Sequence, residues 1–506
     1  MSLVSLLGNA ANSGVPIVAV RTADQPAVAG QITACFGSAG WAVVCWDSVR
    51  GCLAGNSAGT QALALLTSEV GDASILQDFT ACLAASLAVM PQKTVLLAQG
   101  AHRTLFDSRP AQAVLNLRDS FAQSGRMLVL LGPDFEFPRE LGSDVLVIDD
   151  PLPDALARAA IVDAIVDAAE VEVSQEMRLE AQRSTRGLSQ FAAGQVVAMA
   201  TIPGVGIDVQ TLRARWREAI NSTAGLAVDD SGATLDHVAG LEAYKAFALS
   251  VAAGKSRPQT VVRLDEIEKA LGGALGGGDT SGVSQGILGA LLTWMEENAA
   301  TGIIAVGPPG AGKSLCSVAT GAACGAPTVT LDVGALKGSL VGQSEERART
   351  ALRTLAAVAG KTFWIATCNS LAAIPPELRR RFRYGIWFFD LPNSAERKAL
   401  WSMYGARFEL DPLDLPANDR GWSGAEIRNC CEMASDLRIS PREAAAWIVP
   451  AAISSADAIE ALRKSAAGKY LSATEPGPYV YRGSITSDDA AQAATPARKL
   501  GGFGAS

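Results

Sequence analysis

The sequence predicts an α/β protein with two parallel sheets, of which the second carries a phosphate-binding loop and is followed by a helical lid. Three observations lead to this fold class. Short, continuous apolar segments alternate with helical periods in both halves of the chain, which is typical of parallel strands covered on both faces. The segment GPPGAGKS at 307–314 joins an apolar strand to a helix. The pair Asp265 and Glu266 closes another apolar strand, upstream of that segment.

The composition limits the kinds of protein that this chain can be. Its 506 residues, 49% hydrophobic and 19% charged, are enough for several globular units. The formal net charge of −8 argues against nucleic acid as a partner. The sequence predicts a soluble, cytoplasmic protein without membrane contact, because it has neither a basic leader nor an apolar run of roughly twenty residues. Nine cysteines without a CxxC pair predict buried thiols rather than disulfides or a zinc site.

The first part of the chain, residues 1–155, is predicted to form an α/β domain without catalytic machinery. The strand VPIVAV is followed by RTADQP, which lacks a Gly-Lys-Ser turn, and KTVLLAQ is followed by GAHRTL, which lacks an acidic pair. We therefore expect a degenerate nucleotide-binding fold here. Its strands are predicted at 15–20, 40–46, 93–99, 126–132 and 144–149.

The rest of the chain divides into four further segments. Apolar residues spaced three and four apart predict a helical, lid-like region at 156–225, and a polar joint containing glycine separates it from the second half. A second α/β core is predicted at 226–392, with a helical lid at 393–471. The last segment, 472–506, is rich in Gly, Ala, Ser and Pro without periodicity, which predicts a flexible tail.

The segment GPPGAGKS has the residue types that bind phosphate groups. Its glycines let backbone N–H groups approach a phosphate without a Cβ in the way, while Lys313 supplies a positive charge and Ser314 offers a hydroxyl to Mg²⁺. A chance glycine-rich turn is the alternative, but the flanking strand and helix argue against it. The nucleotide-binding residues predicted here are Gly307, Pro308, Pro309, Gly310, Ala311, Gly312, Lys313, Ser314 and Leu315.

Hydrolysis of a nucleotide also needs carboxylates, one to support the Mg²⁺ and one to orient the attacking water. No apolar strand ending in Asp-Glu follows the loop, and we interpret Asp332 as a loop residue because no second acid follows it. Asp265 and Glu266 end an upstream strand, and neighbouring parallel strands bring their carboxyl ends together whatever their order in the chain. We therefore predict that Asp265 lies close to Ser314. The alternative is a solvated acidic pair that opens a surface helix.

Three further segments carry candidate site residues. FWIATCNS is an apolar strand that runs out to Asn369, which is placed to polarise the γ-phosphate. PPELRRRFRYG presents three arginines at 379–381, which could reach the phosphate of a neighbouring subunit, with a solvated basic turn as the alternative. GWSGAEIRNC has a helix N-cap signal at Ser423, and the sequence leaves open whether Arg428 on that helix faces a nucleotide.

The second half resembles the AAA+ ATPases. Within them it is similar to the AAA subgroup of plastids and cyanobacteria that carries a degenerate AAA-like domain at its N-terminus. The resemblance covers residues 236–438 and rests on the segments HVAGLEAYKAF, DEIEKAL, GVSQGILGALLTWMEE, GPPGAGKS, LDVGALKGSLVGQSEERAR, IATCNS, LPNSAER and GWSGAEIRNC. It implies a P-loop NTPase core with ATP and Mg²⁺ as cofactors.

The resemblance also implies roles for individual residues. Ser314 and Asp265 would form the metal site, Asp265 through water, while Lys313 binds phosphate. Glu266 would polarise the attacking water, and Asn369 resembles sensor 1. The remaining implied residues are an arginine finger at Arg381 with Arg380 or Arg379 as its companion, an adenine pocket lined by Val238 and Ala239, and a lid contact at Gly424 and Ala425.

The chain departs from the family pattern in three ways. The strand and helix that carry Asp265 and Glu266 precede the phosphate loop, which within the core amounts to a circular permutation. The arginine turn is about one residue shorter than the usual LRxGRF, which leaves the companion arginine open. In GSLVGQSE, Leu340 stands where threading members place an aromatic residue, which weakens a polypeptide-threading role.

The leading functional prediction is a homo-oligomeric ring, expected to be a hexamer, that couples Mg²⁺-dependent ATP hydrolysis to remodelling of a protein partner. The first alternative is a nucleotide-gated assembly or scaffold protein with little turnover, which the degenerate first half and the predicted tail favour. The second alternative is a nucleic-acid-associated motor, which the acidic balance disfavours.

Overall fold

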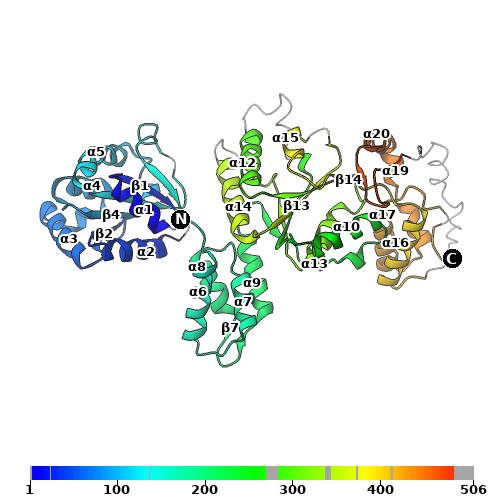
Figure 1. Cartoon of the computed structure of the whole chain (residues 1–506), viewed down its shortest axis with the longest axis horizontal. Coiled ribbons are helices and arrows are strands. Elements are labelled where there is room, and N and C mark those ends of the chain that lie inside the picture. The colour runs from blue at the N-terminus through cyan, green and yellow to red at the C-terminus, as the bar shows by residue number, and fades with distance from the viewer. Residues whose placement is uncertain are drawn as a thin grey trace, which may run out of the picture. The chain divides into compact units, whose positions relative to one another are not determined.

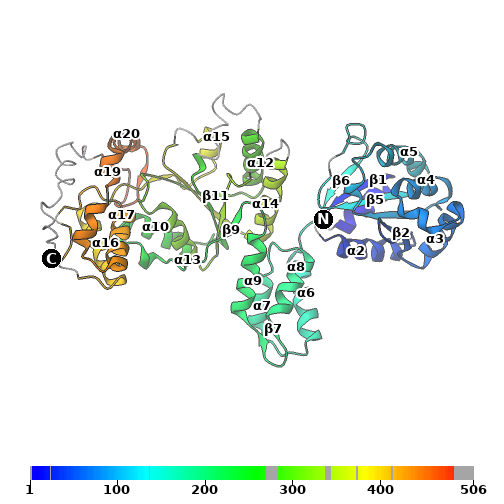
Figure 2. The same cartoon turned by 180° about the vertical axis from the view of Figure 1, so that it is seen from behind.

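The computed structural model of the chain is shown in Figures 1 and 2. It describes residues 3–22, 24–135, 137–268, 283–336, 343–371, 374–411, 414–416, 418–481 and 483. The chain divides into two compact units, Met1–Leu212 and Arg213–Ser506. The boundaries that the sequence suggests within these units, at 155, 225 and 392, stay predictions.

The first unit contains a six-stranded sheet in the order β3-β2-β4-β5-β1-β6, parallel except for β3. Five of the strands match the predicted ones, whereas β3 was not predicted because it is a short, half-exposed edge strand without an apolar run. The strands are β1 (Ile17–Arg21), β2 (Ala42–Asp47), β3 (Gly51–Ala54), β4 (Thr94–Gln99), β5 (Met127–Gly132) and β6 (Leu146–Asp149).

Helices cover both faces of this first sheet, as continuous apolar strands require. Helices α1 (Leu3–Asn12) and α2 (Gln25–Ser38) pack on one face, against Val18 and Val129 among others. On the other face, α3 (Ser57–Val70), α4 (Phe79–Val89) and α5 (Ser108–Ser124) pack against side chains such as Ile17 and Leu128 (Figure 1). The alternation of these residues along β1 and β5 gives each face its own core.

The connection from β1 to α2 is short. The strand ends at Arg21 and the helix begins at Gln25, so the connection is too short for a glycine-rich loop. The carboxylate of Asp24 caps the helix, with Oδ1 accepting the Ala27 N–H at 3.3 Å. A negative side chain therefore stands at the helix end where a phosphate would need free N–H donors.

A helical segment follows the first sheet, as the apolar spacing predicts. It contains α6 (Ala155–Ala168), α7 (Gln175–Arg183), α8 (Gln190–Ala200) and α9 (Val209–Asn221), with a two-stranded hairpin of β7 (Thr201–Ile202) and β8 (Gly206–Ile207). The boundary between the two compact units falls within α9.

The second unit contains a seven-stranded sheet in the order β15-β14-β11-β13-β10-β12-β9, parallel except for β9. Strand β13 therefore lies between two strands of the candidate site. One is β10, which leads into the acidic pair, and the other is β11, which leads into the phosphate loop. The strands are β9 (Leu226–Val228), β10 (Thr260–Leu264), β11 (Thr301–Val306), β12 (Thr328–Leu331), β13 (Thr362–Cys368), β14 (Ile386–Phe388) and β15 (Leu471–Ser472).

Two pairs of helices cover the second sheet (Figure 1). Helix α12 (Val283–Glu297) connects β10 to β11, as the sequence predicts for a crossover between parallel strands, and it packs beside α14 (Gln343–Ala359). Helices α10 (Glu242–Ala253) and α13 (Lys313–Cys324) pack together on the other face, over a core that includes Ile303 and Phe363. The α/β class with a parallel P-loop-type sheet and helical lid is confirmed.

The lid consists mainly of α16 (Ser394–Arg407) and α17 (Gly424–Leu437), which pack on each other around Trp401 and Ile427. Both helices begin with a capping box, in which a Ser or Asn side chain and a Glu side chain satisfy each other's backbone N–H groups. Three short helices complete this part of the chain: α18 (Pro441–Ala444), α19 (Ala451–Ser454) and α20 (Ala456–Ala466).

The start of the predicted flexible tail, residue 472, is wrong. Strand β15 pairs with β14 at Leu471 and Ser472, and the Ala473 N–H donates to the Phe388 carbonyl at 3.0 Å. The Tyr479 hydroxyl donates to Asp390 Oδ2 at 2.7 Å, and its ring packs on Phe388. Buried aromatic side chains thus fix a segment whose Gly and Pro content suggested a tail. Residue 482 and residues 484–506 lie outside the described residues.

Two further expectations concern the whole chain. All nine cysteines are free and seven are buried, which agrees with the predicted thiols. Across the part of the chain that the structure describes, no single helix is long and apolar enough to cross a membrane. One bent pair, Pro441–Ser454 with Ala456–Ala466, passes the same criterion on length and composition alone.

Candidate active site

The acidic strand and the phosphate loop meet at one edge of the second sheet. The Ser314 hydroxyl donates to Asp265 Oδ1 at 3.1 Å, although 49 residues of chain separate them. Ser314 is the second residue of α13, which starts at Lys313, and Asp265 is the first residue after β10. The structure thus brings Asp265 close to Ser314, as predicted from strand adjacency, and the roles of the two residues stay predictions.

Thr367, near the end of β13, contacts both residues of the acidic pair. Its hydroxyl donates to Asp265 Oδ1 and accepts the Glu266 N–H at 3.1 Å. Glu266 has a φ of 45°, a backbone conformation that costs free energy for a residue with a Cβ and is often found at functional sites. The chain therefore turns sharply after Asp265, and the Glu266 side chain is left exposed.

Lys313 is buried in the loop and uses all three of its N–H donors. Its Nζ donates to the Gly307 carbonyl at 2.7 Å, the Pro308 carbonyl at 2.8 Å and Asn369 Oδ1 at 3.0 Å. Its side chain is buried, and this burial lowers the pKa of Lys313 to about 8, although the negative groups around it oppose the shift. Asn369, from the end of β13, thus faces the lysine that the sequence assigns to phosphate.

The phosphate loop also contacts the lid. Gly310 and Gly312 have φ values of 77° and 87°, which favour glycine. A Cβ on Gly310 would lie 2.7 Å from the Ser423 hydroxyl, and the Gly310 carbonyl accepts the Ala425 N–H at 3.2 Å. Because Ser423 caps α17, the lid helix begins directly against the loop.

A cavity of about 530 Å³ lies between the loop, the lid and the segment before α10. Its walls include the predicted nucleotide-binding residues Val238, Ala239, Gly310, Ala311, Gly312, Lys313, Ser314, Leu315, Gly424 and Ala425, together with Arg428, which the sequence left open. Asp265 and Asn369 are not among the lining residues, but they accept hydrogen bonds from two residues that are, Ser314 and Lys313. Gly307 and Pro308 hold Lys313, whereas Pro309 is exposed.

Glu396 links three segments around the cavity. Its carboxylate accepts the Leu241 N–H at 3.0 Å, the Asn393 N–H at 2.9 Å and the Thr474 hydroxyl at 2.9 Å. A Cβ on Gly240 would lie 2.6 Å from Glu396 Cγ, so the segment after Ala239 passes close to the lid. One buried carboxylate thus joins the predicted adenine-binding segment, the lid and the C-terminal segment.

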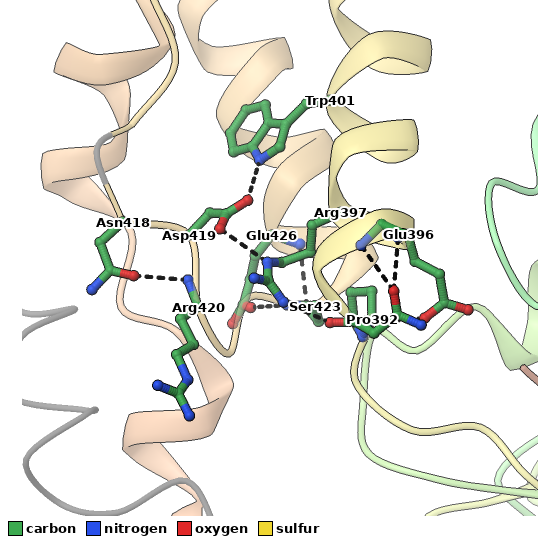
Figure 3. Close-up of polar contacts among 11 residues, drawn as sticks. Pro392, Glu396, Arg397, Trp401, Asn418, Asp419, Arg420, Ser423 and Glu426 are labelled. Carbon is green, nitrogen blue, oxygen red and sulfur yellow. Dashed lines mark hydrogen bonds and ion pairs between the residues drawn. The ribbon is translucent and has the colours of Figure 1, made fainter.

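Asp419 forms hydrogen bonds to two side chains of helix α16 in the lid (Figure 3). Its two carboxylate oxygens accept hydrogen bonds from Arg397 Nε and Trp401 Nε1, both at 2.9 Å. Arg397 also donates to the Pro392 carbonyl at 2.9 Å. The segment that leads into α17 is therefore fixed on α16, which positions Ser423 and Gly424 over the phosphate loop.

Comparisons with known proteins match two segments of the chain. The family model for the N-terminal domain of SpoVK-like AAA ATPases matches residues 4–149, and the model for the ATPase family associated with various cellular activities (AAA) matches residues 303–359. Both models describe AAA ATPases, so the chain is similar to that family over these two segments. The similarity supports nucleotide binding and an ATPase function in general terms, and AAA proteins typically oligomerise.

Several relatives of this chain are named "uncharacterized AAA domain-containing protein ycf46". The protein from Guillardia theta is 21% identical over 383 residues, covering 66% of this chain and 69% of the relative. The protein from Trieres chinensis is 23% identical over 377 residues, with 65% and 69% covered. A third, from Pyropia yezoensis, is 28% identical over 175 residues, with 25% and 35% covered. The predicted resemblance to the plastid-type subgroup is confirmed.

The three candidate arginines have different surroundings. Arg379 donates to the Ile374 and Leu371 carbonyls, both at 2.8 Å, so it holds its own loop. Arg381 donates to Glu296 Oε2 at 2.8 Å. The backbone N–H of Arg380 donates to the Pro376 carbonyl at 3.2 Å, whereas its exposed side chain makes no hydrogen bond or ion pair with any residue that the structure describes. Leu340, which bears on polypeptide threading, lies outside the described residues.

Three residues at the candidate site were missed by sequence reasoning: Thr367, Glu396 and Glu268. Thr367 and Glu396 stand in the segments IATCNS and LPNSAER, which were assigned to the family without a role for these side chains. Glu268 lies two residues after Glu266, in the segment DEIEKAL, and has no predicted role. A search for polar residues near strand ends would have found Thr367 and Glu268 but not their partners.

Proposed function

We propose that the second unit hydrolyses ATP with Mg²⁺ and acts as one protomer of a homo-oligomeric ring, a hexamer, that remodels a protein partner. The observation that carries the proposal is the 3.1 Å contact between Ser314 and Asp265. It joins a phosphate-loop hydroxyl to a carboxylate beside a second acid, and it places them behind a cavity lined by Lys313. Those are the parts that phosphoryl transfer to water requires.

The residues present fit both cofactors. A cavity of about 530 Å³ lies within the range of small-molecule sites, and the start of α13 offers backbone N–H groups to phosphate oxygens. The Ser314 hydroxyl and the Asp265 carboxylate are oxygen ligands of the kind that Mg²⁺ prefers, and Mg²⁺ usually keeps water molecules between itself and one or more carboxylates. When bound there, Mg²⁺ would neutralise charge on the phosphate oxygens.

Each residue then has one task in the proposed reaction. Lys313 neutralises negative charge on the outer phosphates, and Asn369 orients Lys313 and the terminal phosphate. Asp265 orients the ligands of the metal site together with Ser314. Glu266, exposed at the tip of the sharp turn, accepts a hydrogen bond from the attacking water and takes up its proton.

We further propose that the acidic unit has been moved ahead of the phosphate-loop unit, a circular permutation within the core. In the chain the order is β10, β11, β12, β13, whereas in the sheet β13 separates β11 from β10. The AAA family match supports this view, because it begins in β11 and stops at residue 359, the end of α14. Beyond that point β13 follows directly, without an intervening acidic strand.

The ring is expected to supply an arginine to the neighbouring protomer's site. Arg380 suits this role better than Arg381, since Arg381 is paired with Glu296 within its own chain.

Steady-state phosphate release from the full chain with ATP and Mg²⁺ should show many turnovers per chain. Arg380→Ala should lower the steady-state turnover on the order of 10³-fold, because an arginine finger stabilises charge in the transition state.

Arg383→Ala is the matched control, since Arg383 is an exposed arginine on the same turn, and it should keep near wild-type turnover. If Arg380→Ala and Arg383→Ala behave alike, Arg380 is not the finger. If the wild-type chain assembles with ATP but shows no steady-state turnover, the scaffold function replaces the enzymatic one. A large rise in turnover on adding nucleic acid would favour the motor function instead.

A further inference from the structure

A third carboxylate, Glu268, lies beside the acidic pair and contacts the proposed sensor residue. Its Oε1 accepts the Asn369 N–H at 2.8 Å. Its Oε2 is buried and has no hydrogen-bond partner among the residues that the structure describes. Glu268 as a whole is half-buried, but a carboxylate with one buried, unpaired oxygen, one directed contact and no ion pair among the described residues is not explained by surface solvation or by a salt bridge.

The contact between Glu268 and Asn369 lies beyond the last paired residues of strands β10 and β13. The ladder between β10 and β13 runs in register from the pair Thr260 and Thr362 to the pair Leu264 and Ala366. Beyond that point the chain turns at Glu266, so the backbones after the two strands have no further ladder to fix their spacing. Two side-chain hydrogen bonds connect the segments after the two strands. Thr367 donates to the Asp265 carboxylate, and the Glu268 carboxylate accepts the Asn369 N–H.

The Glu268 contact acts on the phosphate loop through Asn369. The backbone N–H of Asn369 is held by Glu268, and its side-chain Oδ1 accepts from Lys313 Nζ at 3.0 Å. An Asn side chain has two torsions between its backbone and its amide, so a fixed backbone fixes the point from which the side chain starts, and the Lys313 contact then selects the position of Oδ1. A loss of the Glu268 contact would let Asn369 move relative to Lys313.

We infer that Glu268 is a positioning residue for ATP hydrolysis, which holds Asn369 in place against Lys313. This inference rests on the proposed function. It does not make Glu268 a catalytic residue, because the reacting atoms meet Asn369, Lys313 and Glu266. A hydrogen bond to a charged acceptor is stronger than one to a neutral acceptor, which suits a contact whose task is to keep a backbone segment fixed.

The test is a double-mutant cycle on the full chain, with kcat and KM for ATP and the Kd of a fluorescent ATP analogue measured for each variant. Glu268→Leu should lower kcat by about 10- to 100-fold, as the loss of supporting contacts typically does, and leave the analogue's Kd within about threefold. Glu268→Gln should keep most of kcat, because its amide oxygen can still accept the Asn369 N–H. Glu297→Leu, at an exposed glutamate of α12, is the control and should match the wild type.

The cycle is completed by Asn369→Ala, alone and combined with Glu268→Leu. If Glu268 acts through Asn369, the double variant should be no slower than Asn369→Ala. Losses that multiply, a Glu268→Gln variant as slow as Glu268→Leu, or an unchanged kcat in Glu268→Leu would each overturn the inference while leaving the ATPase proposal intact. A wild-type chain without turnover would overturn the ATPase proposal, and this inference with it.

Discussion

Glu266→Gln should bind ATP as the wild type does and hydrolyse it about 10²- to 10⁴-fold more slowly, which is the usual contribution of a general base. Gln has the same size and can still orient a water molecule, but it cannot accept a proton. The turn at Glu266 is fixed by the Thr367 contact to its backbone N–H, which the substitution retains. Phosphate release under steady-state conditions and titration with a fluorescent ATP analogue measure the two effects separately.

The matched control for this variant is Glu69→Gln, at an exposed glutamate of α3 in the first unit. It should leave both kcat and the Kd unchanged. A Glu266→Gln variant with wild-type kcat would show that the upstream acidic pair is not the catalytic pair. A variant that binds ATP poorly would instead indicate that Glu266 supports the fold of the site.

Lys313→Ala should weaken ATP binding by roughly 10- to 100-fold, because it removes charge-assisted hydrogen bonds to phosphate, each of which contributes about 1.5–3 kcal/mol. Lys255→Ala, at an exposed lysine of the same unit, should bind ATP normally. The effect in Lys313→Ala should appear in the Kd of the ATP analogue. Unchanged binding would contradict the assignment of the loop.

The pH dependence of ATP binding provides an independent test of the same lysine. Burial lowers the pKa of Lys313 to about 8, and only the charged form neutralises phosphate. Affinity of the wild type should therefore be flat below about pH 7.5 and fall as the pH rises above 8. The fall should be absent in Lys313→Ala. A wild-type Kd that stays constant up to pH 9 would contradict a role for the charged lysine.

Much of the fold and the site followed from local patterns in the sequence. Continuous apolar strands predicted both parallel sheets, and the strand and helix around GPPGAGKS predicted the loop. The contact between Asp265 and Ser314 was predicted by topology, because parallel strands meet at one edge whatever their order. Polar residues at strand ends are therefore informative even when their order in the chain is unfamiliar.

Other features depend on contacts between distant residues and could not be predicted. Glu396 binds backbone and side-chain donors from segments as far away as Leu241 and Thr474, and no local pattern encodes such partners. The C-terminal segment was mistaken for a tail because its composition concealed the packing of Tyr479 on Phe388. The different pairing of the three arginines likewise depends on the tertiary position of Glu296.

The central claim is that the acidic strand upstream of the phosphate loop completes the metal site. The most direct measurement is the affinity of Mn²⁺ for the protein–ATP-analogue complex, determined by electron paramagnetic resonance for Asp265→Asn and for Asp332→Asn. Asp332 is the acid downstream of the loop, and its Oδ1 caps its own turn by accepting the Gly334 N–H at 2.8 Å. We expect Asp265→Asn to weaken Mn²⁺ binding about 10- to 100-fold and Asp332→Asn to leave it unchanged. Weakened binding in Asp332→Asn with normal binding in Asp265→Asn would contradict the claim.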